Sequence, residues 1–524
     1  MPASHEIPTV RDSVVRLLRE FGITTIFGNP GSTELPLFRH FPDDFRYVLG
    51  LQESVVLGMA DGFAQATGNA ALVNLHSAAG TGHALGNLFT AYRNYTPLIV
   101  TAGQQARSIL PYEPYLFAER ATEFPRPYVK WSAEPARAED VPAAFAHAYY
   151  IAMQPPRGPV FLSLPVDDWD RPGSWHVVRK VSRRVLGDPD MLTRAGASLA
   201  SATRPVIVAG AGIARDGAWR EVIALSEKHS APVWVAPVSA RAGFPENHAN
   251  FAGFLSASRE DIRNKLSGAD VILVLGGPVS RYHIEGDGPH LPEGAQTFIV
   301  TDDPATAAWA PAGDAIISDI KTAAAALLAH SAREGRLPVT AFKRATPAVT
   351  SPMTDAYVLS RVAALRPAGS IIVEEAPSSR AAMHDHLPII DEDSFFVGAS
   401  GGLGHALPAA IGVALGRPNR RVIAILGDGS SMYAIQGLWS AGQHDLAVTF
   451  VVLRNGRYQA LVDFDRYFKM DRDIGTSLPN IDLCGLAIAQ GLKAFRSETV
   501  DDLDLNLKAA LTHNGPSLIE VAIE

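Results

Sequence analysis

Two polar residues that follow apolar segments carry the clearest chemical signal in the sequence. Asp428 stands in the run GDGSS (427–431) directly after the apolar segment 421–427, and Asn455 follows the next apolar segment, 448–453. Ligands bind at the carboxyl ends of strands in open α/β sheets, so the two side chains are expected to converge. A carboxylate and an amide oxygen are hard ligands that suit Mg²⁺, which often shares them with phosphate oxygens. We therefore expect Asp428 and Asn455 to bind Mg²⁺.

The residues around Asp428 point to a diphosphate. Gly427 and Gly429 would let backbone N–H groups approach phosphate oxygens. The following segment, 431–442, is expected to be helical, and its N-terminal dipole would face the anion. A lone Gly-Asp-Gly is more often an ordinary turn. Its combination with Asn-Gly after the next strand favours a ligand site.

A second set of polar residues follows three successive strands near the N-terminus. Ser32 lies in GNPGS, Glu53 follows the run YVLG, and His76 follows the segment 71–75. Parallel strand ends would bring the three to one edge. Each also has a plainer interpretation: Glu53 as a surface carboxylate, His76 as a core histidine, and Ser32 as a helix N-cap followed by Glu34.

Short apolar runs alternate with longer segments rich in Ala and Leu throughout the chain. Continuous rather than alternating apolar strands indicate parallel sheets that helices cover on both faces. We expect an α/β fold made of doubly wound parallel sheets. The expected strands are 23–27, 71–75, 97–102, 160–164, 205–210, 271–276, 297–301, 370–375, 421–427, 448–453 and 517–523.

Two polar, turn-rich stretches, 166–190 and 333–355, have the composition of linkers. A chain of 524 residues is long enough for about three domains. We expect an N-terminal domain over 1–180, a central Rossmann-like domain over 185–340, and a C-terminal domain over 345–524.

Composition excludes several function classes. Hydrophobic residues make up 47% of the chain, which is enough for several buried cores. This composition is not that of an intrinsically disordered protein. The net charge of -8 gives no electrostatic basis for binding nucleic acid. The single cysteine, Cys484, cannot form an internal disulfide, which fits a reducing compartment. No signal peptide or membrane-spanning run is recognisable, so we expect a cytoplasmic protein without membrane contacts.

The Gly-Asp-Gly run with its downstream Asn resembles the thiamin-diphosphate motif of the pyruvate decarboxylase and acetolactate synthase superfamily. FGNPGSTELP, NLHSAAGTG, GGPVSRYH and GGLGHALPAAIGVAL are similar to segments of benzoylformate decarboxylases, and such segments extend from about residue 20 to 455. The resemblance implies non-oxidative decarboxylation of an aromatic 2-keto acid, such as benzoylformate, to the aldehyde. It implies thiamin diphosphate and Mg²⁺ as cofactors, no flavin, and a homo-oligomer, usually a tetramer, with active sites between subunits.

The resemblance also assigns catalytic roles. Glu53 would activate the aminopyrimidine ring of the cofactor, and Ser32 would hydrogen-bond the substrate carboxylate. His76 would help to protonate the developing alkoxide. His283, in the run PVSRYH, would assist the later protonation and the release of the aldehyde.

Mg²⁺ would be bound by the side chains of Asp428 and Asn455 and by the main-chain carbonyl of Arg457, and Leu403 would hold the cofactor in its bent form. Two positions depart from the family pattern: Arg454 replaces a frequent Asn, and Pro377 cannot donate a hydrogen bond, which leaves that task to Ser378. The residues expected at the cofactor are Asn29, Pro30, Gly31, Glu53, Ser378, Gly401, Leu403, Gly427, Asp428, Gly429, Ser430, Asn455 and Tyr458.

Three other functions remain open at this stage. The first is another thiamin-diphosphate enzyme, either a carboligase of the acetolactate synthase type or a decarboxylase of phenylpyruvate or indolepyruvate. The segment 457–471 would line the substrate pocket, and Asp463, Asp465 and Arg466 leave the accepted acid undecided. The second is a nicotinamide dehydrogenase, suggested by the Gly-rich run 206–217, which lacks the third glycine of the dinucleotide fingerprint. The third is a binding module that keeps the fold without catalysis.

Overall fold

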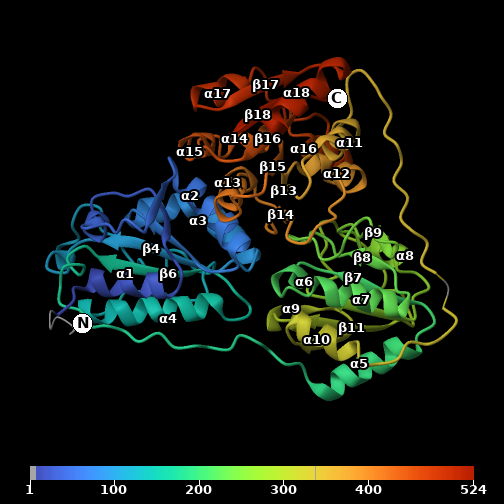
Figure 1. The fold of residues 1–524 in the computed structure, drawn as a ribbon, viewed down its shortest axis with the longest axis horizontal. Coiled ribbons are helices and arrows are strands. Elements are labelled where there is room, and N and C mark those ends of the chain that lie inside the picture. Colours follow the sequence, from blue (N-terminus) through green and yellow to red (C-terminus); the bar gives the residue numbers. More distant parts are fainter. Residues whose placement is uncertain (1–6, 337) are drawn as a thin grey trace. The chain divides into compact units, whose positions relative to one another are not determined.

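The computed structural model describes residues 7–336 and 338–524 (Figure 1). The chain forms two compact units. The first unit comprises Met1–Ser182, Val373–Ser378 and Ser400–Glu524, and the second comprises Arg183–Ile372 and Ser379–Ala399. Residues of the expected N-terminal and C-terminal domains therefore pack into one unit. The segment Ser379–Ala399, expected in the C-terminal domain, clusters with the second unit instead.

The first unit begins with a six-stranded sheet in the order β2-β1-β3-β4-β6-β5. Its paired strands run parallel, and β3 and β4 are buried along their whole length. In Figure 1, α1 and α4 lie on one side of this sheet and α2 and α3 on the other, as the continuous apolar runs predict. The strands are β1 Thr25–Gly28, β2 Arg46–Leu49, β3 Ala71–Leu75, β4 Leu98–Gln104, β5 Ser132–Ala133 and β6 Val160–Pro165.

A C-terminal sheet repeats this topology, in the order β14-β13-β15-β16-β18-β17. Each of its strands stands where the corresponding strand of the N-terminal sheet stands, so both sheets have their topological switch point between the strands in second and third place. Ligands in open α/β sheets bind at such points. The strands are β13 Ile371–Glu375, β14 Phe395–Val397, β15 Val422–Gly427, β16 Val448–Arg454, β17 Lys493–Ser497 and β18 Ser517–Ala522.

The second unit contains the middle sheet, in the order β12-β11-β10-β7-β8-β9. Successive residues of its central strands enter two different buried clusters: Ile207 and Leu273 belong to one, and Val208 and Ile272 to the other. Both faces of the sheet are therefore covered, which confirms the doubly wound α/β fold. The strands are β7 Pro205–Ala209, β8 Val233–Val235, β9 Phe251–Phe254, β10 Val271–Leu275, β11 Gln296–Thr301 and β12 Asp314–Ile317.

Helices connect the strands of all three sheets. None of the helices in 7–336 and 338–524 combines the length and the apolar character needed to cross a membrane. The helices are α1 Val10–Glu20, η1 Leu35–Phe38, α2 Glu53–Thr67, α3 Ser77–Arg93, η2 Leu110–Tyr112, η3 Ala138–Asp140, α4 Val141–Met153, α5 Pro189–Ser201, α6 Gly212–Arg215, α7 Trp219–His229, α8 Arg259–Lys265, α9 Pro304–Trp309, α10 Ile320–Leu327, α11 Asp355–Leu365, η4 Pro377–Ser379, α12 Arg380–His386, α13 Ala406–Gly416, α14 Asp428–Met432, α15 Gly437–Gln443, α16 Gln459–Phe468, α17 Leu483–Ala489 and α18 Val500–Thr512.

Helices α2 and α13, both in the first unit, pack against each other with their backbones in close contact. A Cβ atom on Gly62 would lie 2.1 Å from the carbonyl oxygen of Ala409, and one on Gly412 would lie 1.9 Å from that of Met59. Only glycine fits such contacts. The glycines therefore hold α2, which begins at Glu53, against α13.

The prediction of one continuous helix over 431–442 is wrong, because the helix starts earlier and is interrupted. The helix begins earlier, at Asp428, and α14 ends at Met432. Tyr433 and Ala434 donate their backbone N–H groups to carbonyls three residues back, at Ser430 and Ser431, instead of four. These tighter turns interrupt the α-helix, and helical structure resumes only in α15.

Candidate active site

The loops after β13 and β15 meet at the switch point of the C-terminal sheet. The hydroxyl of Ser430 donates a hydrogen bond of 2.7 Å to the carbonyl oxygen of Glu375, which ends β13. The same hydroxyl accepts from the backbone N–H of Gly427 at 3.1 Å. The Gly-Asp-Gly turn is thus fixed across the crevice at the place where an α/β sheet binds its ligand.

Asp428 and Asn455 converge as their spacing suggests. One carboxylate oxygen of Asp428 accepts from the backbone N–H groups of Asn455, at 3.2 Å, and Gly456, at 2.7 Å. The other accepts from the N–H of Gly429 at 2.7 Å. Burial raises the pKa of the Asp428 carboxyl above its ordinary value, although these three N–H groups act in the opposite direction. A bound cation would favour the ionised form.

The ligand set at this turn fits Mg²⁺ by its chemistry. The side-chain oxygen of Asn455 lies 3.3 Å from the backbone nitrogen of Arg457, so the amide side chain folds over the turn that carries the third expected ligand. Carboxylate, amide and carbonyl oxygens are the donors that this ion prefers. Residues 7–336 and 338–524 contain no cluster of three or more His, Cys, Asp or Glu side chains that could hold a metal. The candidate for the expected Mg²⁺ is the oxygen set of Asp428, Asn455 and Arg457, because of its chemistry.

Gly429 also has a structural requirement, separate from its expected contact with phosphate. A Cβ atom at this position would lie 2.4 Å from the ring of Tyr458. Burial raises the pKa of the Tyr458 hydroxyl, and the nearby Tyr433 and Asp428 add to the effect. The tyrosine covers the turn closely, which agrees with its expected place beside the cofactor.

The turn before α13 is held by Glu375, which the sequence did not single out. Its buried carboxylate accepts from three successive backbone N–H groups, those of Gly404, His405 and Ala406, at 2.7 to 2.8 Å. Burial raises the pKa of Glu375 despite these bonds. The carboxylate thereby fixes the segment that contains Leu403, which is half-buried.

The other expected cofactor contacts near these turns are exposed. Gly401 has a φ angle of +76°, in the region that favours glycine, and Ser378 lies on the 3₁₀ turn η4. Both residues belong to the first unit. Their contacts to the cofactor stay predictions.

At the N-terminal sheet, His76 pairs with the carboxylate of Glu34, which was expected only in the first turn of a helix capped by Ser32. Its Nδ1 donates to Glu34 at 2.9 Å, and the Glu34 side chain is 1% exposed. Glu34 also accepts from the backbone N–H groups of Gly31, at 2.8 Å, and Gly103, at 2.9 Å. Thr33 donates to it at 2.7 Å. Glu34 therefore fixes the loop after β1 and the orientation of His76 together.

The interpretation of Ser32 as a helix N-cap is wrong. The helix that follows, η1, is a 3₁₀ helix whose N-cap residue is Glu34 and which contains Pro36. Because the Glu34 carboxylate turns inward to bind backbone N–H groups, the chain at Ser32 is a turn and not a helix start. The Ser32 side chain is exposed and lies one residue after Gly31, whose Cα hydrogens face the ring of His76.

Glu53 is the first residue of α2 and is 9% exposed, so it is not the surface carboxylate of the plainer interpretation. One carboxylate oxygen accepts from Nδ1 of His83 on α3 at 3.0 Å. The other lies 3.5 Å from the side-chain amide of Asn29. Asn29 and Pro30, both expected at the cofactor, belong to the same loop and are half-buried. Glu53, Asn29 and His76 thus belong to one edge.

His283 lies in the second unit, in the loop after β10. Its backbone N–H donates to the carbonyl of Ala257 at 2.9 Å, and the residue is exposed. Its catalytic role stays a prediction. The segment 457–471 forms the exposed helix α16 and its flanks, with Asp463, Asp465 and Arg466 on that helix.

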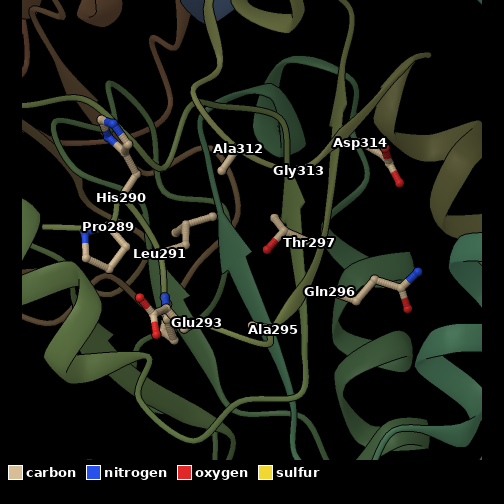
Figure 2. A pocket seen from close by; sticks show the side chains of 11 residues that line it. Pro289, His290, Leu291, Glu293, Ala295, Gln296, Thr297, Ala312, Gly313 and Asp314 are labelled. Atoms are coloured by element: carbon tan, nitrogen blue, oxygen red, sulfur yellow. The ribbon is translucent and has the colours of Figure 1, made fainter.

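The second unit contains a surface hollow that matches none of the predicted sites. The hollow, of about 490 Å³, lies beside Pro289, His290 and Leu291 (Figure 2). It also contacts Gln296 and Asp314, the first residues of β11 and β12, so it lies at the amino ends of these strands and away from the ligand-binding edge.

The Gly-rich run that suggested a dinucleotide site has a structural explanation. The backbone N–H of Gly212 donates to the carbonyl of Gly276 at 2.7 Å, and a Cβ atom on Gly212 would lie 2.6 Å from the Cα of Gly276. The loops after β7 and β10 thus pack backbone to backbone. The glycines serve this close contact at the switch point of the middle sheet.

The thiamine pyrophosphate enzyme family matches the chain in three segments. Its N-terminal TPP-binding domain matches residues 8–120, its central domain residues 192–327, and its C-terminal TPP-binding domain residues 378–521. The first and third segments contain the N-terminal and C-terminal edges described above.

Full-length relatives agree with these matches. Benzoylformate decarboxylase of Pseudomonas aeruginosa is 43% identical over 520 residues, which cover 98% of each chain. The crystal structure of benzoylformate decarboxylase from Polynucleobacter necessarius is 40% identical, with a TM-score of 0.96 and 98% of each chain covered. The 4-hydroxybenzoylformate decarboxylase of Rhodococcus jostii RHA1 is 39% identical, with a TM-score of 0.94 and 99% of each chain covered. By sequence and by fold, the chain belongs to the thiamine pyrophosphate enzymes and, among them, to the benzoylformate decarboxylase family.

Proposed function

We propose that the protein decarboxylates an aromatic 2-keto acid, such as benzoylformate, to the aldehyde and carbon dioxide, with thiamin diphosphate and Mg²⁺ as cofactors. The observation that carries the proposal is the pair of ligand-binding edges in the first unit. One presents a buried carboxylate, Glu53, at the start of a helix, and the other presents the oxygen ligands and backbone of the Gly-Asp-Gly turn. Bound thiamin diphosphate supplies a nucleophilic carbon for the keto group and accepts the electron pair that carbon dioxide leaves behind.

The C-terminal edge would hold the anionic end of the cofactor. Asp428 and Asn455 would contribute side-chain oxygens to Mg²⁺, and Arg457 its carbonyl. The backbone around Gly429 and the hydroxyl of Ser430 lie where the diphosphate would bind. Ser430 is already held by Glu375, so its position does not depend on the ligand.

The N-terminal edge would carry the proton transfers. Glu53 would hold or release a proton at the carboxylate oxygen that faces Asn29, beside the pyrimidine ring. Ser32 would hydrogen-bond the substrate carboxylate. His76 would donate a proton to the oxygen of the substrate keto group, because Glu34 holds its Nδ1 and leaves Nε2 as the reacting nitrogen.

We further propose that the working form is a homo-oligomer, with the tetramer as the expected state, whose active sites lie between subunits. Strongly exposed aromatic side chains support subunit contacts: Tyr112 and Tyr115 are 81% and 88% exposed, and Phe468 on α16 is 66% exposed. The single cysteine, Cys484, supports a cytoplasmic location. Light scattering on the purified protein would measure the oligomer.

A substrate screen tests the proposed reaction. The protein, stripped of cofactor, is assayed for carbon dioxide release from benzoylformate, 4-hydroxybenzoylformate, phenylpyruvate, indolepyruvate and pyruvate, with and without added thiamin diphosphate and Mg²⁺. We expect release from the first two acids, dependent on both additions, with free aldehyde as the product. Preferential release from phenylpyruvate or indolepyruvate, or an acyloin as the main product, would favour the alternative thiamin-diphosphate enzymes and overturn the proposal.

A further inference from the structure

The two oxygens of the Glu53 carboxylate have unequal partners. Oε2 accepts a hydrogen bond of 3.0 Å from Nδ1 of His83. Oε1 has the amide of Asn29 at 3.5 Å, which is at the limit of a hydrogen bond. A Cβ atom on Gly80, one turn before His83 on α3, would lie 3.3 Å from Oε1, so α3 lies close against the carboxylate. One oxygen is therefore occupied and the other remains open.

We propose that His83 is a positioning residue for Glu53. This inference rests on the proposed function, in which Glu53 exchanges a proton with the aminopyrimidine ring. By binding Oε2, the imidazole holds the carboxylate in one orientation and directs Oε1 toward the ring. The ionised carboxylate can only accept, so Nδ1 of His83 carries the hydrogen. The Glu53 side chain is thus ordered before the cofactor binds, so the loss of its conformational entropy does not oppose binding.

Substitutions at position 83 test the positioning role. H83A removes the donor, and alanine suits the exposed position of a 17-residue helix. H83N keeps a donor, because the asparagine Nδ2 stands where the histidine Nδ1 stands. E53Q tests the proposed role of Glu53 itself. The readouts are the rate of deuterium exchange at C2 of bound thiamin diphosphate, followed without substrate, and the dissociation constant of the cofactor in the presence of Mg²⁺.

For H83A we expect C2 exchange to slow about 10-fold or more, as the loss of a hydrogen bond to a charged group implies. H83N should restore exchange to within about threefold of the wild type.

Each outcome decides a different claim. If H83A exchanges at the wild-type rate while E53Q loses exchange, the inference about His83 is overturned and the role of Glu53 stands. If E53Q also exchanges normally, the proposed role of Glu53 is overturned. An H83N variant as slow as H83A would mean that the imidazole acts by more than its donor, which contradicts positioning.

Discussion

The N-terminal and C-terminal sheets have the same strand order and carry different chemistry at corresponding edges. At the N-terminal edge, carboxylates pair with histidine side chains: Glu34 with His76, and Glu53 with His83, although Glu34 also accepts from two backbone N–H groups. At the C-terminal edge, carboxylates bind backbone N–H groups: Asp428 accepts three, and Glu375 accepts three. The shared topology determines where ligands can bind, and the loop residues determine what is done there.

The difference has a physical consequence for substitution. Carboxylate–histidine pairs place groups that can transfer protons, and removal of the histidine leaves the main chain of the loop largely in place. Carboxylates that bind several N–H groups hold the main chain itself. We therefore expect changes at the N-terminal edge to affect rate, and changes at the C-terminal edge to affect binding of the cofactor.

The largest expected effect is that of Asp428→Ala. Loss of the carboxylate removes a proposed Mg²⁺ ligand and releases three backbone N–H groups, so decarboxylation should fall by on the order of 10³-fold, mainly through weaker cofactor binding. Calorimetric titration with thiamin diphosphate and Mg²⁺ measures this. Asp504→Ala, at an exposed position on α18, is the control and should bind normally. If D428A bound thiamin diphosphate and Mg²⁺ normally, the C-terminal edge would not differ from the N-terminal edge in its effect on cofactor binding.

His76→Ala should lower kcat by about 100-fold, the lower end of the usual contribution of an acid–base group. Ser32→Ala should likewise lower the rate, by loss of a contact to the substrate carboxylate. In both variants the dissociation constant of thiamin diphosphate should stay within about threefold of the wild type, since neither is proposed to bind the diphosphate. Steady-state kinetics and cofactor titration together check this. Weaker cofactor binding with an unchanged kcat would contradict the assignment of catalysis to the N-terminal edge and cofactor binding to the C-terminal edge.

Glu34→Gln sharpens the comparison because it keeps the shape of a buried side chain and removes its charge. The glutamine cannot accept all the bonds that Glu34 makes, so the orientation of His76 should loosen and kcat should fall about 10-fold. Cofactor affinity should change little. Thr33→Val, which removes one of the donors to Glu34, is the milder control. Equal kcat in E34Q and the wild type would mean that Glu34 only holds the loop.

The smallest expected effect is on the stability of the contact between α2 and α13. There the buried side chains of His405 and Asp61 bind each other. Burial lowers the pKa of His405, but Asp61 and Glu375 outweigh it, so the folded pKa is raised. Its contribution to stability is therefore fully present below the unfolded value of about 6.5 and is lost as pH rises through the folded pKa.

Urea unfolding should thus show a wild-type protein that is less stable at pH 9 than at pH 6, because part of the stability that protonated His405 contributes is lost over this range. His405→Gln should be less stable than the wild type at pH 6, and the part of the pH dependence that His405 contributes should disappear. An unchanged slope in this variant would show that other groups set the pH dependence.

Much of the architecture could be predicted because apolar runs dominate it. The long buried strands were recognisable, and both strand-end motifs were visible as short runs. Edge strands such as β5 and β14, with two and three residues, give too weak a pattern. Glu34, Glu375 and His83 were not identified as site residues, because their roles depend on contacts between residues 30 or more positions apart. Side-chain direction in a loop is set by tertiary packing and has no period in the sequence.

Protein engineers often stabilise helices by replacing glycine with alanine, since alanine restricts the unfolded chain. That rule reverses at Gly62 and Gly412, where one added methyl group would meet a main-chain oxygen of the opposite helix about 2 Å away. Such a change would act as a wedge between the two cofactor-binding halves. Programmes that seek a more heat-tolerant biocatalyst should leave both positions untouched and search the exposed helices instead.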